Sequence, residues 1–168
     1  MKLLIVTAAV AALLMGCTAP TQVSTNPIAR PPFPEHEYAA LATTGTAIVT
    51  GQAFLKTLGG DVKTAAGEGV YLNPVTSYST YAYTASDGDQ RPMAPPDQRL
   101  LQYVKSVTAD ATGRFTFKNV PPGDYYVTTK VTWQAPTGYQ GALSTQGGVL
   151  RKRVTAKNSE STEVILTR

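Results

Sequence analysis

Few residues in this chain of 168 could take part in catalysis or bind a metal ion. The sequence contains one histidine, His36, and one cysteine, Cys17. A catalytic zinc site needs about three converging ligands, and Ser-His-Asp or Cys-His catalysis needs a histidine beside the nucleophile. Asp87-Gly-Asp89 has the short spacing of a calcium loop, but no glutamate completes an EF-hand, so we expect a solvated turn. We predict no catalytic residue, no metal site and no cofactor, and therefore a protein that is not an enzyme.

Cys17 lies at the end of an apolar segment. Lys2 precedes a predominantly apolar run from Leu3 to Met15. This run of about 13 residues is shorter than the about 20 residues that a membrane-spanning helix needs, and polar, proline-containing sequence follows it. The pattern is typical of a secretory signal that is removed from the mature protein. An unpaired thiol is a liability in the oxidising compartment to which such a signal leads, so we expect Cys17 to be modified.

The tetrapeptide Leu14-Met15-Gly16-Cys17 resembles the lipobox of bacterial lipoproteins. The resemblance implies cleavage between Gly16 and Cys17, removal of residues 1–16 as signal peptide, and attachment of lipid, including palmitate, to Cys17. Two or more acyl chains hold a protein stably at a membrane. Thr18 occupies the position where an aspartate would favour retention in the inner membrane. In a Gram-negative cell, the resemblance therefore implies an outer-membrane anchor with the protein facing the periplasm.

Residues 17–44 are predicted to be the lipidated cysteine followed by a flexible linker. The segment shows no apolar periodicity and contains five prolines, Pro20, Pro27, Pro31, Pro32 and Pro34. As a flexible coil it would span about 30 Å and would lift the folded domain away from the membrane. Pro31-Pro32-Phe33-Pro34 could instead be recognised by an aromatic groove. His36 lies in the same segment, where a mobile linker would not hold the geometry of a metal site.

Residues 45–168 have the pattern of a single all-β domain, which we predict to be a Greek-key-type β-sandwich of about seven strands. The clearest signal is the strand–turn–strand pattern of residues 110–127, where Gly123 suits a positive φ. Alternation from residue 125 to 133 places one set of side chains on the core side and the other on the opposite side. The predicted core residues are Phe115, Phe117, Val127, Val131 and Trp133. We expect residues 84–99 to form a long exposed loop.

The motifs Asp110-Ala-Thr-Gly-Arg-Phe-Thr-Phe and Asn119-Val-Pro-Pro-Gly-Asp-Tyr-Tyr-Val resemble the carboxypeptidase regulatory-like domain, a transthyretin-like β-sandwich. The resemblance covers about residues 46–167 and is specific for the fold rather than for a function. In carboxypeptidases such domains are an accessory fold beside the catalytic domain, and elsewhere they occur in surface proteins, receptors and carbohydrate-active proteins. Residues 73–102 are longer than the usual link of that family. A function peculiar to this protein could therefore lie in that stretch.

Two surface features are candidates for contact with a ligand or partner. The first consists of Tyr78, Tyr81 and Tyr83, whose amphipathic rings suit sugar stacking or a protein interface; alternatively, these rings cover one edge of the sandwich. The second is the basic run that contains Arg151 and Arg153, which could meet an anionic lipid or wall polymer. On a strand, Lys152 would point away from these two arginines and divide the patch.

These observations favour a non-enzymatic envelope lipoprotein whose sandwich serves as a protein-interaction or structural module. The alternative is a glycan-binding module that recognises cell-wall or surface polysaccharide through the Tyr-rich segment. The net charge of +4 is too small to suggest a nucleic-acid partner. The expected partners are the membrane, reached through the lipid, an envelope protein and, under the alternative, a glycan.

Overall fold

The structure is a computed structural model that describes residues 26–85, 91–138 and 141–168. The predicted signal peptide, Gly16, Cys17 and the turn at residues 86–90 lie outside the described residues. No helix among the described residues is both long and apolar enough to span a bilayer. The elements in chain order are α1 (Glu35–Ala39), β1 (Ala47–Lys56), β2 (Val62–Thr64), β3 (Gly69–Pro74), α2 (Ser77–Ala85), the 3₁₀ helix η1 (Gln98–Gln102), β4 (Lys105–Thr108), β5 (Arg114–Val120), β6 (Gly123–Pro136), β7 (Leu143–Ala156) and β8 (Ser161–Leu166).

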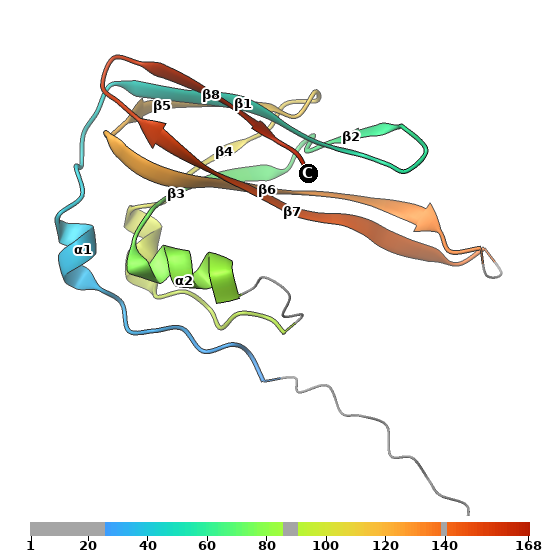
Figure 1. The fold of residues 1–168 in the computed structure, drawn as a ribbon, viewed down its shortest axis with the longest axis horizontal. Helices are drawn as coiled ribbons and strands as arrows, with labels where there is room; N and C mark the ends of the chain where they lie inside the picture. The colour runs from blue at the N-terminus through green and yellow to red at the C-terminus, as the bar shows by residue number, and fades with distance from the viewer. Residues whose placement is uncertain (1–25, 86–90, 139–140) are drawn as a thin grey trace, which may run out of the picture.

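The strands form two sheets that pack face to face (Figure 1), which confirms the predicted all-β sandwich. In the first sheet β1 pairs antiparallel with β2 and β5 and parallel with β8. The second sheet has the order β4-β3-β6-β7, and all of its pairs are antiparallel. The described part of the chain contains eight strands, one more than expected, because the short strand β2 follows a Gly-Gly turn that carried no strand signal.

The main core fills the space between the two sheets. Phe115 and Phe117 of β5 and Val127 and Val131 of β6 are buried there, as the alternation predicted, while Trp133 is only partly buried. Each fully buried side chain of this size contributes about 1.5–3 kcal/mol to folding. Gly123 has a φ of 152°, so the turn between β5 and β6 uses the conformational freedom of glycine that the sequence indicated.

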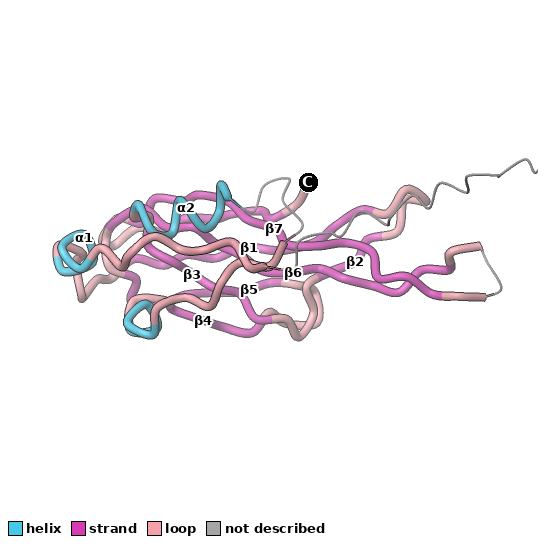
Figure 2. Tube along the Cα trace, turned by 90° about the horizontal axis from the view of Figure 1, so that it is seen from below, coloured by secondary structure: helices cyan, strands magenta, loops and turns pink. Residues whose placement is uncertain are grey.

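A third layer covers part of the outer face of the β4-β3-β6-β7 sheet. Figures 1 and 2 show α1 and α2 gathered at the same end of the molecule, away from the tip of the β6–β7 hairpin. This layer has its own small core, formed by Tyr38, Tyr78 and Leu100 together with Phe33, Leu41, Tyr103 and Val104. The rings of Phe33 and Tyr38 stack with their centroids 4.5 Å apart.

The outer layer corrects two sequence-based expectations. Residues 26–44 were predicted to be a flexible linker, but Tyr38 is only 1% exposed and Ile28 forms a β-bridge with Met93. The physical reason is that a few apolar side chains pack against partners distant in sequence. No local hydrophobic periodicity therefore predicts their burial. Within residues 84–99, expected to form an exposed loop, the described part belongs to the same layer, because α2 continues to Ala85 and Met93 pairs with Ile28.

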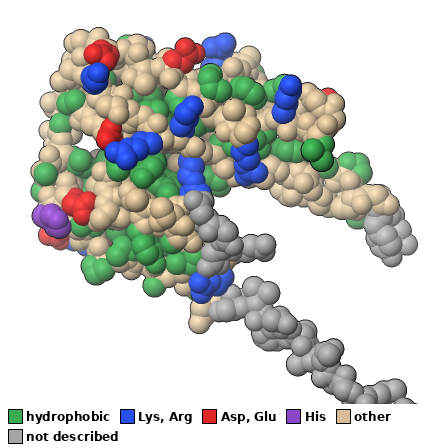
Figure 3. All heavy atoms as spheres, in the orientation of Figure 1, with side chains coloured by type: hydrophobic (Ala, Val, Ile, Leu, Met, Phe, Trp, Pro, Cys, Tyr) green, Lys and Arg blue, Asp and Glu red, His purple; other side chains and the backbone are tan. Residues whose placement is uncertain are grey.

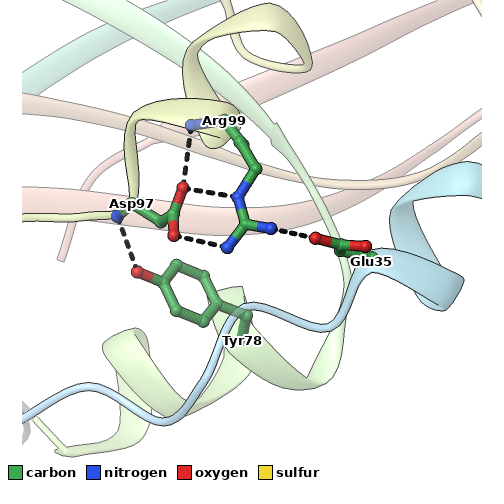
Figure 4. A network of polar contacts seen from close by, with 4 residues as sticks. All are labelled: Glu35, Tyr78, Asp97 and Arg99. Carbon is green, nitrogen blue, oxygen red and sulfur yellow. Dashed lines mark hydrogen bonds and ion pairs between the residues drawn. The ribbon is translucent and has the colours of Figure 1, made fainter.

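A network of hydrogen bonds and ion pairs connects the segments of the outer layer (Figure 4). The backbone N–H of Asp97 donates a hydrogen bond to the Tyr78 hydroxyl over 2.9 Å. The guanidinium of Arg99 forms hydrogen bonds of 2.9 and 2.7 Å with the Asp97 carboxylate and also pairs with Glu35 of the N-terminal segment. Arg99 further lies over the ring of Phe33, 4.6 Å from its centroid. The network therefore holds residues 33–41 and 97–103 in fixed positions beside the sheet.

Candidate functional site

Strand pairing arranges polar and aromatic side chains in rows across the outer face of the β4-β3-β6-β7 sheet. Successive side chains of a strand point to opposite faces, so residues that alternate with the buried core positions face outward. The register aligns Ser106, Tyr71, Thr128 and Arg151 across the four strands. The next outward row aligns Asn73, Tyr126 and Arg153. These rows bring together side chains from strands far apart in the sequence.

Helix α2 lies against part of these rows. The ring of Tyr83 packs on that of Tyr126 with their centroids 4.4 Å apart, and the hydroxyls of Thr80 and Tyr126 are 3.2 Å apart. Arg151 donates a hydrogen bond to the backbone carbonyl of Tyr83, and its guanidinium lies 5.7 Å from the centroid of the same ring. Tyr83 and Arg151 are therefore positioned together by a helix and an edge strand.

The sequence around residue 76 explains why the helix begins where it does. The Thr76 hydroxyl accepts a hydrogen bond from the backbone N–H of Ser79 (3.2 Å), and the Ser79 hydroxyl accepts one from the N–H of Thr76 (2.9 Å). This reciprocal arrangement is a capping box. It fixes the start of α2 at the end of β3, and thereby sets the position of Tyr83 over the sheet.

Three adjoining cavities lie over the rows, and we call them together the outer-face groove. Their volumes are about 410, 340 and 530 Å³. The first two share Tyr71 and Thr128, while the second and third share Asn73, Tyr83 and Leu100. The sheet forms the floor, and α2 and η1 contribute the walls. Tyr71 is 50% exposed, so its ring is available to a ligand.

The groove differs in charge along its length. At one end Lys130 and Glu68 form an ion pair of 3.5 Å. At the other end the cavity of about 530 Å³ is lined by Arg30, Arg151 and Arg168. Figure 3 shows Lys and Arg side chains across the middle and right of the visible face, with the Asp and Glu side chains mainly towards its left and upper edges.

Between these ends the groove contains neutral hydrogen-bonding groups. Burial raises the pKa of the Tyr83 hydroxyl above its ordinary value, although hydrogen bonds with Thr128 and Asn73 oppose that rise. The hydroxyl therefore stays protonated at neutral pH. Within the described residues no donor reaches the buried Oδ1 of Asn73. Buried polar atoms usually have a partner, so this atom is an acceptor with remaining capacity.

The arrangement suits binding. Aromatic rings offer a flat apolar surface with a polar edge, and amide, hydroxyl and guanidinium groups donate or accept hydrogen bonds in fixed directions. Among the described residues, no group of three or more His, Cys, Asp or Glu side chains lies close enough to hold a metal. His36 is exposed on helix α1 of the outer layer, and it does not line any of the three cavities.

The sequence-predicted site residues separate into those that meet at the groove and those that do not. Tyr83 and Arg151 lie together in it. Tyr78 is only 2% exposed and belongs to the small core of the outer layer, as the alternative interpretation of the Tyr segment allowed. Tyr81 is 39% exposed on α2 but does not line the cavities. Arg153 forms an ion pair of 2.6 Å with Asp124.

Sequence reasoning did not identify Tyr71, Asn73, Thr128, Arg30 or Arg168 as site residues. For Tyr71 and Thr128 a signal was present, because both alternate with buried positions of their strands. Their partnership depends on the register between β3 and β6, which alternation alone does not give. Arg30 and Arg168 come from segments outside the strands, and no local pattern marks them.

Comparison with known proteins adds one informative relative. No family model matches the chain, and no curated protein matches it. A crystal structure at 2.61 Å resolution from Pseudomonas aeruginosa, described as that of a "putative carbohydrate binding protein", is similar to this chain over 83% of its length and 99% of the other chain. The sequence identity is 36% and the TM-score is 0.72. At this level of identity and coverage, the chain belongs to the same family as the Pseudomonas aeruginosa protein.

Proposed function

We propose that the protein is a carbohydrate-binding protein of the cell envelope and that it binds glycan in the outer-face groove. The observation that carries the proposal is the exposed ring of Tyr71 beside Asn73, Thr128 and Tyr83 in adjoining cavities. A sugar ring presents an apolar face and a rim of hydroxyls. The groove offers an aromatic face for the first and amide and hydroxyl groups for the second.

The family relationship supports the same function. The relative is described as carbohydrate binding, which favours the glycan interpretation over a general protein-interaction module. Fold alone would not carry function, but here the relative and the residues of the groove point to the same ligand class. The protein-interaction module remains a sequence-based prediction, which crosslinking in intact cells would test.

The direct test is to measure glycan binding by the full chain before and after removal of one ring. A library of cell-wall and surface polysaccharides is screened first, and the affinity for the best ligand is then measured by calorimetry. Tyr71→Ala is expected to weaken binding about tenfold or more, which corresponds to about 1.4 kcal/mol. The matched control is Tyr81→Ala, because Tyr81 is also an exposed tyrosine but lies outside the cavities. Equal affinities for the two variants, or no binding by the native chain, would overturn the proposal.

We also propose that binding is not followed by catalysis and that a lipid on Cys17 holds the protein at the membrane. The first point is supported by the position of His36 away from the groove. The second is supported by the resemblance of Leu14–Cys17 to a lipobox. In this arrangement the described domain would present the groove to polysaccharide in the envelope while the lipid prevents loss of the protein. Incubation of the candidate glycans with the protein, followed by mass analysis, should leave them intact.

A further inference from the structure

The basic end of the outer-face groove has a feature that neutral-sugar binding does not explain. The cavity of about 530 Å³ is lined by three arginines that come from three separate parts of the chain. Arg30 belongs to the N-terminal segment, Arg151 to β7 and Arg168 follows β8. Among the described residues that line this cavity, none is acidic.

Contacts with neutral groups hold Arg30 and Arg168 in place. The Nε–H of Arg30 donates to the backbone carbonyl of Ala94 over 2.6 Å, and its guanidinium lies 5.6 Å from the centroid of the Tyr78 ring. A terminal nitrogen of Arg168 lies 3.5 Å from the carbonyl oxygen of Val149. Within the described part of the chain, neither Arg30 nor Arg168 is paired with a carboxylate. No acidic side chain of the described residues therefore neutralises either guanidinium.

Arg30 and Arg168 line the same cavity, so their like charges repel each other, and an anion in the cavity would relieve that repulsion. Apolar neighbours such as Met93, Pro96 and Leu100 line the same cavity and reduce the screening by water. A guanidinium presents its N–H groups in a planar fork that matches the two oxygens of a carboxylate. The chemistry of this end therefore favours a carboxylate.

The cavity is also continuous with the part of the groove that would receive a sugar ring. Tyr83 and Asn73 line both this cavity and its neighbour of about 340 Å³. A ligand that fills both must carry an anionic group next to a ring with hydroxyls. We propose, on the basis of the glycan-binding function above, that the groove selects acidic saccharides and that Arg30 and Arg168 recognise the carboxylate of a uronic acid unit.

The experiment compares oligomers that differ only in charge. Tetramers of galacturonate, glucuronate and mannuronate and their methyl esters are titrated into the full chain by calorimetry. At least one acidic tetramer is expected to bind about tenfold or more tightly than its own ester, and its affinity is expected to fall as salt is raised. Esters that bind as tightly as the acids would overturn the acidic preference.

Two charge-removing variants and one control assign the effect to the groove. Arg168→Gln and Arg30→Gln should each weaken binding of the acidic tetramer about fivefold or more and leave binding of the ester unchanged. Arg114→Gln removes the same charge from an exposed position on β5 of the other sheet and should change neither. Arg168 makes a long hydrogen bond of 3.5 Å with the Val149 carbonyl, which its variant can lose at little cost. The Arg168 variant therefore remains informative if loss of the Arg30–Ala94 bond disturbs folding, which a thermal melt would reveal.

The outcomes separate this inference from the proposed function. Neutral glycans that bind in a Tyr71-dependent manner, with no preference for acids, would retain the carbohydrate-binding function and overturn the acidic selectivity. Inorganic phosphate that binds as tightly as the tetramers would identify a simple anion site and also overturn it. Absence of binding to acidic and neutral glycans alike would overturn both.

Discussion

The carboxylate of Glu37 accepts hydrogen bonds from both the backbone N–H and the hydroxyl of Ser77, the N–H bond being 2.7 Å long. Helix α1 thereby caps the N-terminus of α2 from a position 40 residues away in sequence. The first N–H groups of a helix have no partner within the helix, and a negative charge near them is favourable. This contact fixes the N-terminal segment to the helix that carries Tyr83.

Replacement of Glu37 by alanine should loosen the outer layer and leave the sandwich intact. Loss of a capping interaction costs about 0.5–2 kcal/mol. Hydrogen exchange is expected to speed up in α1 and α2, with little change at core strands such as β1 and β6. The control is Glu160→Ala. Glu160 forms an exposed ion pair with Lys157 over 3.9 Å, and loss of this ion pair should change stability by less than about 0.5 kcal/mol. Similar exchange in both variants would contradict the capping role.

Stability should fall in acid over a defined pH range. Hydrogen bonds and the charge of Arg99 lower the pKa of Asp97 from 3.8 to about 2, and the hydrogen bonds from Ser77 lower the pKa of Glu37 from 4.5. A carboxyl with a lower pKa in the folded state binds fewer protons there than in the unfolded chain. The stabilising contribution is therefore complete above about pH 4.5 and is lost as the pH falls towards 2.

Thermal melts between pH 7 and pH 2 measure this effect. The melting temperature is expected to be nearly constant above pH 5 and to decrease steadily below pH 4.5. The Asp97→Asn variant should show a shallower decrease, because the side chain that replaces Asp97 does not titrate. A variant whose melting temperature falls as steeply as that of the native chain would show that Asp97 does not contribute.

A methyl group at Gly51 should damage the first sheet. A Cβ at this position would lie 2.0 Å from the Val164 carbonyl oxygen and 2.7 Å from a ring carbon of Phe115. Both neighbours belong to strands that pair with β1. Gly51→Ala is expected to destabilise the protein by about 1–3 kcal/mol or more, the range for overpacked cores.

Gly59→Ala is the matched control for that prediction, because the nearest atom to its Cβ would be a hydroxyl oxygen 3.8 Å away. Denaturation by urea gives the free energy of unfolding for both variants. Little change is expected for Gly59→Ala. Equal stability of the two variants would mean that β1 can move away from its neighbours more easily than the structure indicates.

The proposed lipid anchor predicts the distribution of the protein between cell fractions. Cys17→Ala should abolish incorporation of labelled palmitate and move the protein from the membrane to the soluble fraction. Thr18→Asp keeps the cysteine, so this variant should remain lipidated but move to the inner membrane of a Gram-negative cell. Membrane retention of the Cys17→Ala protein would contradict the anchor.

The sandwich was predictable because its signals are local. Alternation along β5 and β6 marks Phe115, Phe117, Val127 and Val131 as core residues, and each is buried between the sheets. The outer layer was not predictable, because Tyr38 and Tyr78 are buried by contacts with segments distant in sequence. Helix α2 is rich in Tyr, Thr and Ser, residues that favour helix interiors less than alanine or leucine do. Its capping box and Glu37 compensate for this weakness.

Only part of the candidate site could be found before the fold was known. Tyr83 and Arg151 were candidates from their residue types, and the structure places them in contact. Tyr71 is indistinguishable in sequence from any other strand tyrosine until the register places it beside Thr128. The basic cavity depends on Arg30 and Arg168, which only the tertiary fold brings to the same place.

The parallel pairing of β1 with β8 has a consequence for the order of folding. Thr46 and Ser159, next to the start of that pair, hydrogen-bond across 113 positions of sequence. Nearly the whole domain must therefore be present before β1 gains β8 as its third strand partner, and long-range pairing of this kind is slow. In the interval the part of β1 that pairs with β8, Ile48 to Ala53, has one unpaired edge, which is the kind of edge that a chaperone or another unfolded chain binds by strand addition. A newly made molecule is thus most vulnerable to aggregation immediately before β8 arrives.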